Sequence, residues 1–193
     1  MKKAMLFIVI FASLYIASGM SSVGAEEPDS PTAVISNHHA ALRNFTAGAV
    51  TQGELDQILA AGVRAPSAGN RQPWHFTVVR NPALANQIVS NMPDGNILIV
   101  ISASGDGKTN GREILDCALA TQSIYLAAQA LGLGSRIYTG PMDTINQRFK
   151  ADLGLPNGYG AVSLVRIGRV LPGIDAVSAA SSRKSLDSIV NYK

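Results

Sequence analysis

The spacing of apolar residues divides most of the chain into short helices and strands. Leu55, Ile58 and Leu59 form one stripe at helical spacing, directly after the capping-box sequence Thr51-Gln-Gly-Glu54. Residues 97–103 form a continuous apolar run, which is typical of a buried strand. We therefore predict helices over residues 31–43, 51–65, 81–90, 112–130 and 143–153. We predict strands over residues 74–80, 97–103, 135–139 and 161–170.

Residues 112–130 form the longest predicted helix and carry apolar side chains nearly all the way round. Such a helix lies in the centre of a domain or in an interface between subunits. Gly132 follows it as a candidate left-handed C-terminal cap. Asn81 and Asp143 are the predicted N-terminal caps of two shorter helices.

The predicted helices and strands are mixed, without the regular strand–helix–strand alternation of a doubly wound parallel sheet. This order favours an α+β sandwich. The segment Gly132-Leu-Gly134 follows a helix rather than a strand, so it is not a dinucleotide-binding fingerprint. The sequence also lacks a glycine-rich phosphate-binding loop of the Lys-Ser/Thr type.

Residues 1–25 have the pattern of a targeting segment. Lys2 and Lys3 precede a long apolar run, and a stretch of small residues then leads to the cleavage site. We predict a signal peptide that is removed from an exported, periplasmic domain of residues 26–193; an uncleaved membrane anchor is the alternative. Removing the two lysines from the 16 basic residues leaves 14, against 13 acidic residues. The mature chain is therefore nearly neutral, and its charge gives no argument for binding nucleic acid.

The chain has one cysteine, Cys117, which lies in the apolar pattern of the long helix. A single cysteine excludes an intramolecular disulfide, and we interpret it as a buried small residue rather than a redox thiol. His38, His39 and His75 do not have the spacing of a metal site, so we predict no metal. Nothing in the sequence marks a catalytic acid–base pair, and no catalytic residue is predicted.

The stretch Arg64-Ala-Pro-Ser-Ala-Gly-Asn-Arg-Gln-Pro-Trp74 joins a predicted helix to a predicted strand. Its two prolines fix backbone angles and remove donors, and Gly69 permits a left-handed backbone. Polar side chains and free backbone N–H groups are offered by Ser67, Asn70, Arg71 and Gln72. A rigid loop with several directed donors suits a planar polar ligand; an ordinary connection between helix and strand is the alternative.

Residues 65–74 of this loop resemble the signature of the nitroreductase family of FMN-dependent oxidoreductases. Two further segments are similar to the family's central helix and to its C-terminal phosphate-binding segment. They are Asp116-Cys-Ala-Leu-Ala-Thr-Gln-Ser-Ile-Tyr-Leu-Ala-Ala-Gln-Ala-Leu-Gly-Leu-Gly134 and Arg183-Lys-Ser-Leu-Asp-Ser-Ile-Val190. The resemblance extends over residues 33–191. It implies a nitroreductase-like sandwich, with a central, mostly antiparallel sheet flanked by helices, and a homodimer with FMN in two equivalent clefts between the subunits.

The resemblance also implies roles for individual residues, which we state as expectations. Arg43 and Arg64 match basic positions beside the flavin, and Gly140 matches a position where the backbone approaches the flat ring. The C-terminal segment would hold the phosphate. The expected FMN-binding residues are His39, Arg43, Arg64, Pro66, Ser67, Asn70, Gln72, Thr139, Gly140, Arg183 and Lys184.

The activity that the resemblance implies is a two-electron transfer to a nitroaromatic, a quinone or a similar conjugated acceptor. The mechanism would be ping-pong, with NAD(P)H or another reductant as the electron donor. Related flavin chemistry such as reductive dehalogenation, and a non-catalytic exported flavin-binding protein without NAD(P)H turnover, are the alternatives. Export bears on this choice because nicotinamide cofactors are cytoplasmic, so an exported enzyme would need a protein or quinone donor.

The chain departs from the family pattern at two places. The family's Arg-Arg-Ser or Arg-His-Ser aligns with His39, Ala40 and Ala41, so a phosphate-binding arginine and a hydroxyl are absent. Hydrogen bonds to charged groups contribute about 1.5–3 kcal/mol each, so we expect weaker FMN binding unless His39 compensates. In addition, residues 105–111 leave little length for the family's lid, and we expect an open, shallow acceptor site.

Overall fold

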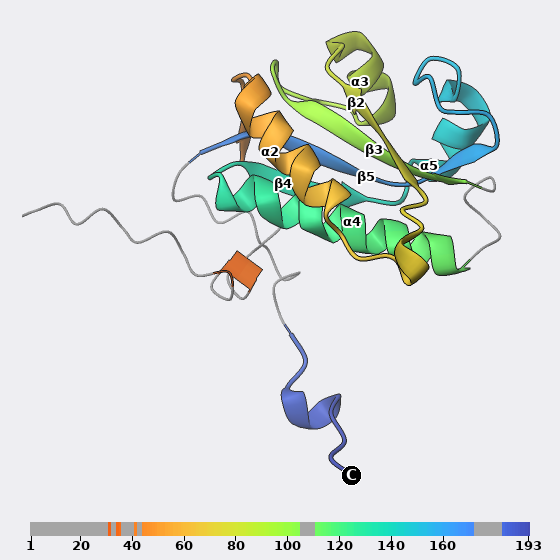
Figure 1. Cartoon of the computed structure of the whole chain (residues 1–193). Coiled ribbons are helices and arrows are strands. Elements are labelled where there is room, and N and C mark those ends of the chain that lie inside the picture. Colours follow the sequence, from red (N-terminus) through yellow and green to blue (C-terminus); the bar gives the residue numbers. More distant parts are fainter. Residues whose placement is uncertain (1–30, 32–33, 36–40, 42–43, 105–110, 172–182) are drawn as a thin grey trace, which may run out of the picture.

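The computed structural model describes residues 31, 34–35, 41, 44–104, 111–171 and 183–193 (Figure 1). The predicted signal peptide, most of the helix predicted over residues 31–43, the short lid segment, and the expected ligands His39 and Arg43 lie outside the described residues. Within the described part of the chain, no helix has the length and apolar character needed to cross a membrane.

The described residues form one five-stranded sheet in which every pairing is antiparallel. Its strands are β1 (Phe45–Thr46), β2 (Trp74–Val79), β3 (Ile97–Ser104), β4 (Gly134–Tyr138) and β5 (Tyr159–Val170). β5 is central, because it pairs with β3 along one edge and with β4 and β1 along the other. β2 pairs with β3 and forms the opposite border of the sheet. The four strands predicted from the sequence are confirmed, and so is the antiparallel arrangement.

Helices cover both faces of this sheet (Figure 1). α2 (Gln52–Val63) and α4 (Gly111–Ala130) pack on one face, and α3 (Pro82–Ile88) and α5 (Met142–Thr144) pack on the other. The described residues also form three short helical turns: η1 (Ala68–Asn70), η2 (Ile145–Phe149) and η4 (Leu186–Ser188). Because both faces are covered, β3 is buried along nearly its whole length, which explains its continuous apolar sequence. The predicted α+β sandwich is confirmed.

The helix ends predicted from the sequence are largely confirmed. Thr51 and Glu54 form the capping box of α2, since the Thr51 N–H donates to the Glu54 carboxylate at 2.8 Å and the Glu54 N–H donates to the Thr51 hydroxyl at 3.3 Å. The side-chain oxygen of Asn81 accepts two backbone N–H groups at the start of α3. Gly132 has a φ of 72° after α4, in the left-handed region expected of a C-terminal cap.

The helix predicted over residues 143–153 begins earlier and ends sooner. Pro141 occupies the N-cap position, α5 starts at Met142, and the helix continues as the π-helical turn η2. Asp143 therefore lies inside the first turn, and the prediction that it caps this helix is wrong. Pro141 has a φ of −74°, which already matches a helical turn, so the chain enters the helix without a side-chain cap.

Apolar side chains are exposed to solvent on α4 and in the C-terminal segment of a single chain. Cys117 is fully buried on the inner side of α4, as predicted, whereas Leu115 is 60% exposed and Leu119 is 39% exposed on its outer side. The C-terminal segment 183–193, drawn in blue, extends away from the sheet (Figure 1). It exposes three further apolar or aromatic side chains, Leu186, Ile189 and Tyr192. These surfaces have no cover within the described residues of a single chain.

Candidate functional site

The loop between α2 and β2 is a compact turn held by its own hydrogen bonds. The hydroxyl oxygen of Ser67 accepts the backbone N–H of Gln72 at 3.0 Å, which closes the loop around η1. Gly69, Asn70 and Gln72 have positive φ angles of 60°, 53° and 48°. Residues other than glycine adopt this conformation rarely, so the surroundings hold this backbone in place. The left-handed backbone predicted at Gly69 is confirmed.

Part of the donor set expected of this loop is used inside the protein. The backbone N–H groups of Ala68, Asn70 and Gln72 each donate a 3.0 Å hydrogen bond to a protein oxygen. The prediction of free backbone donors is therefore wrong for Asn70 and Gln72. The exposed donors of the loop are side chains instead, including those of Arg64 and Arg71.

Asp116 connects this loop to α4. Its Oδ1 accepts the Ala68 N–H at 3.0 Å, the residue is 2% exposed, and its Oδ2 has no hydrogen-bond partner among the described residues. Burying a carboxylate oxygen without a hydrogen-bond partner costs folding free energy. Packing alone therefore does not explain why an acidic residue occupies this position. Asp116 was not among the site residues expected from the sequence. Its spacing could have identified it as a buried polar residue, because Asp116, Ala120 and Ile124 lie four residues apart on the buried stripe of α4.

Thr139 and Gly140 follow β4, far from the loop within one chain. Trp74 begins β2 and Tyr138 ends β4, and β3 and β5 lie between these two strands. Three strand spacings correspond to about 14 Å. A Cβ atom added to Gly140 would meet no atom within 4 Å, so the space beside this residue is open. A single chain therefore does not bring Gly140 into contact with the loop.

Arg183 and Lys184 are exposed at the start of the C-terminal segment. Burial raises the pKa of the Tyr125 hydroxyl in α4, and a hydrogen bond with Gln129 and the positive charge of Arg183 partly offset that rise. Arg183 is therefore close enough to α4 for its charge to act on Tyr125. Tyr125 is nine residues beyond Asp116, or about 14 Å along the helix axis.

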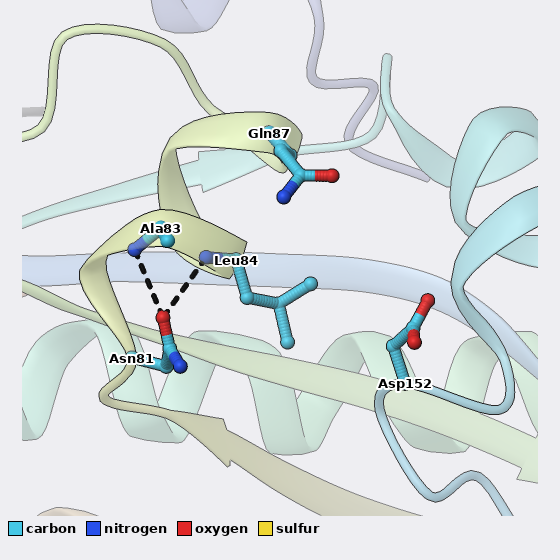
Figure 2. Close-up of a pocket in the computed structure, with 5 residues that line it drawn as sticks. All are labelled: Asn81, Ala83, Leu84, Gln87 and Asp152. Carbon is cyan, nitrogen blue, oxygen red and sulfur yellow. Dashed lines mark hydrogen bonds between the residues drawn. The ribbon is translucent and has the colours of Figure 1, made fainter.

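A separate surface pocket of about 340 Å³ lies between the first turn of α3 and Asp152 (Figure 2). Asn81 turns back toward the helix, and its oxygen accepts the N–H groups of Ala83 and Leu84 at 2.9 and 3.1 Å. The donors at this helix start are thus already paired, and no expected FMN ligand lines the pocket. Elsewhere in the described ranges, no three His, Cys, Asp or Glu side chains gather as metal ligands would.

Comparison with known proteins gives consistent matches. The model of the nitroreductase family matches residues 37–92 and 86–169. A "Putative NADH dehydrogenase/NAD(P)H nitroreductase" from Archaeoglobus fulgidus is 32% identical over 137 residues, which cover 66% of this chain and 78% of the relative. A relative of the same description from Methanothermobacter thermautotrophicus is 37% identical over 106 residues, which cover 51% of this chain and 55% of the relative.

The fold is also found among solved structures. A nitroreductase with bound FMN from Desulfitobacterium hafniense is similar with a TM-score of 0.67. The two proteins share 23% identity, and the match covers 83% of this chain and 96% of the other. A likeness at this level of identity describes the fold, and the arrangement of sheet and helices is common to both.

Proposed function

This chain belongs to the nitroreductase family, and from that premise we propose that it is an FMN-dependent oxidoreductase. It passes two electrons from a reductant to a nitroaromatic, a quinone or a similar conjugated acceptor. The observation that carries the proposal is the constrained loop from Arg64 to Trp74, which Asp116 holds against α4. FMN, when bound, supplies the redox chemistry, so the chain itself needs to bind, orient and polarise rather than provide acids or bases.

The donors of the loop suit the pyrimidine edge of a flavin. The Gln72 side-chain amide donates to the side-chain oxygen of Asn70 at 3.2 Å, so each amide orients the other. Arg64 is exposed at the end of α2, where its positive charge is available to a ligand. We assign Arg64, Pro66, Ser67, Asn70 and Gln72 to the ring. A cation at this edge would favour the more negatively charged, reduced state of the cofactor.

The remaining expected ligands suit the other parts of the cofactor. The open space beside Gly140 leaves room for a flat ring against the backbone of Thr139 and Gly140. Arg183 and Lys184 offer the guanidinium fork and the point charge that commonly bind a phosphate group. His39 and Arg43 remain assigned from the sequence resemblance alone.

We propose that the active form is a homodimer. The loop and Gly140 are separated by two strands within one chain, which supports a ring that lies between two chains and takes one segment from each. Leu115 and Leu119 on α4 and the apolar side chains of the C-terminal segment are exposed in one chain and suit burial in such an interface. Two equivalent clefts then follow from the two-fold symmetry of the dimer.

We further propose that the donor and the acceptor occupy the same cleft in turn, which is the ping-pong mechanism. The cytoplasmic donor NAD(P)H fits an N-terminal segment that does not direct export, and a protein or quinone donor fits an exported enzyme. The second candidate function is an exported flavin-binding protein without NAD(P)H turnover. It is favoured by the His39-Ala-Ala41 sequence, which lacks an arginine and a hydroxyl for the phosphate.

Purified protein tests the proposal directly. We expect a yellow preparation with flavin absorbance, which NADH or NADPH bleaches without oxygen and which a nitroaromatic or a quinone restores. A colourless protein that binds no added FMN would reject both candidate functions. A yellow protein that dithionite reduces, but that neither nicotinamide reduces, would support the flavin-binding protein or a different donor.

Two variants test the site and the dimer. Arg64→Ala should lower the reduction potential of bound FMN, while Arg148→Ala, an exposed arginine on the opposite face, should leave it unchanged. Leu115→Glu should shift the protein from dimer to monomer in sedimentation and weaken FMN binding with it. Ala83→Glu places the same charge on exposed α3 and should leave the dimer intact. If Arg64→Ala leaves the reduction potential of bound FMN unchanged, Arg64 does not contact the ring. If the Leu115→Glu variant is still a dimer, Leu115 does not lie in the dimer interface.

A further inference from the structure

Two arginines face each other across β4 and β5, on the side of the sheet that α3 covers. The register makes Arg136 and Arg166 direct cross-strand partners. Like charges in this position repel, and the cost grows with burial. Arg166 is 95% buried, since its exposed fraction is 5%, and Arg136 is half-buried. Burial and the charge of Arg136 lower the pKa of Arg166, and the Tyr138 hydroxyl partly offsets this.

The two guanidinium groups are held by neutral partners. Nε and Nη2 of Arg166 donate to the side-chain oxygen of Asn96 at 3.3 and 3.0 Å, and its guanidinium carbon lies 4.0 Å from the centroid of the Phe45 ring. Arg136 lies over the Tyr138 ring at 4.7 Å. These contacts orient both side chains without neutralising either charge.

Arg169 lies on β5, the strand that carries Arg166, and its charge is neutralised by an acidic side chain. Arg169 of β5 forms two 2.8 Å hydrogen bonds with the carboxylate of Glu54. Neither Arg136 nor Arg166 has an ion pair with any residue that the structure describes. The sheet therefore pairs one of its arginines with an acid and leaves two facing each other.

The facing pair lines a pocket of about 470 Å³. The pocket is also lined by Ser90 and Asn91, in the segment after α3. Asn91 has a φ of 58°, so the chain turns sharply there. The lining contains two cations, neutral hydrogen-bonding groups and apolar side chains, and no carboxylate.

We propose that this pocket binds a small oxyanion, carried by a phosphate or a carboxylate group. The anion would sit between Arg136 and the Nη1 side of Arg166, because Nε and Nη2 of Arg166 already donate to Asn96. Such pairing replaces the repulsion between the two cations with charge-assisted hydrogen bonds. None of the expected FMN ligands lines this pocket, although Tyr138 directly precedes Thr139, so the proposal uses no residue that is assigned to the flavin site.

Anion-dependent thermal stability of the full-length protein tests the proposal. Saturating FMN is present throughout, so that added phosphate does not act through a phosphate subsite for FMN. Inorganic phosphate and malonate are titrated separately against sodium chloride of matched ionic strength. A concentration tenfold above Kd should raise Tm by roughly 3–6 °C for a protein of this size. A saturable rise with either anion, beyond that with chloride, supports the site and tells phosphate from carboxylate.

Matched variants locate the effect. Arg136→Gln should abolish the anion-dependent rise and, in anion-free buffer of low ionic strength, raise Tm above the wild type because the repulsion is gone. Arg148→Gln removes an exposed arginine outside the pocket and should keep the full response. A wild type that responds to neither anion beyond chloride overturns the proposal. So does an Arg136→Gln variant whose response equals that of the wild type.

Discussion

The backbone N–H of Ala68 and the Oδ1 atom of Asp116 form a 3.0 Å hydrogen bond across 48 positions of sequence. Because Asp116 is buried in α4, this bond fixes the loop that carries the expected flavin contacts. Asp116→Ala should lower the free energy of unfolding by about 1–3 kcal/mol and weaken FMN binding. Asp116→Asn keeps an oxygen for Ala68 and should be milder in both. Urea unfolding and flavin fluorescence titration measure the two effects, and equal losses in the two variants would contradict the role of this acceptor.

Glu54 makes the stability of the protein depend on acid pH. Hydrogen bonds from Arg169 are the main reason why the pKa of Glu54 lies below its ordinary value. A carboxyl group with a lowered folded-state pKa stabilises the protein above the unfolded-state value of about 4.3 and loses that contribution as the pH falls through the folded-state value.

Replacing Glu54 by Gln therefore should flatten the loss of stability between about pH 5 and pH 3. Glutamine still completes the capping box, so the variant isolates the charge. Arg169→Met removes the same ion pair from the other side and should give a similarly shallow profile. Unfolding in urea at a series of pH values measures the slope, and two profiles as steep as that of the wild type would contradict the prediction.

The thiol of Cys117 should be unreactive toward thiol reagents in the folded protein. It is fully buried, and burial together with the charges of Asp116 and Glu113 raises the pKa of its thiol to about 12. The thiolate, which is the reactive form, is thus scarce at pH 8. We expect a disulfide reagent such as DTNB to label the native protein very slowly and the urea-unfolded protein within minutes. Rapid labelling of the native protein would show that the thiol is accessible.

Two glycines should respond to alanine in opposite directions. Gly95 has a φ of 82°, and an added Cβ would lie 2.6 Å from the backbone carbon of Gly48. Gly95→Ala should therefore cost about 2 kcal/mol or more of stability. Gly53 lies in α2 with no atom within 4 Å of an added Cβ, so Gly53→Ala should gain about 0.4–1 kcal/mol. The midpoint of urea unfolding should fall for Gly95→Ala and rise for Gly53→Ala. A Gly95→Ala midpoint that does not fall would contradict the predicted clash.

Local patterns in the sequence predicted most elements of the fold. The capping box at Thr51 and the apolar run of β3 are both written in adjacent residues, so short-range rules identify them. The start of α5 was misplaced because Pro141 already has helical geometry, which makes a capping side chain at Asp143 unnecessary.

Contacts between residues that are distant in the sequence could not be predicted from these short-range patterns. The pairing of Arg136 with Arg166 depends on the register between two strands, and the bond from Ala68 to Asp116 depends on how a loop meets a distant helix. Neither is encoded by nearby residues. For the same reason, the loop sequence did not indicate which of its backbone N–H groups donate to other parts of the protein.

Among the strands that the structure describes, β5 comes last in the sequence, and it is the partner of β1, β3 and β4. During synthesis, β1, β3 and β4 leave the ribosome before the strand with which all three pair. The described sheet can close only after Val170 has emerged from the ribosome. The long separations between its partners also raise the contact order and slow folding. The sheet therefore forms late in the synthesis of this domain, and the growing chain depends on protection from aggregation until then.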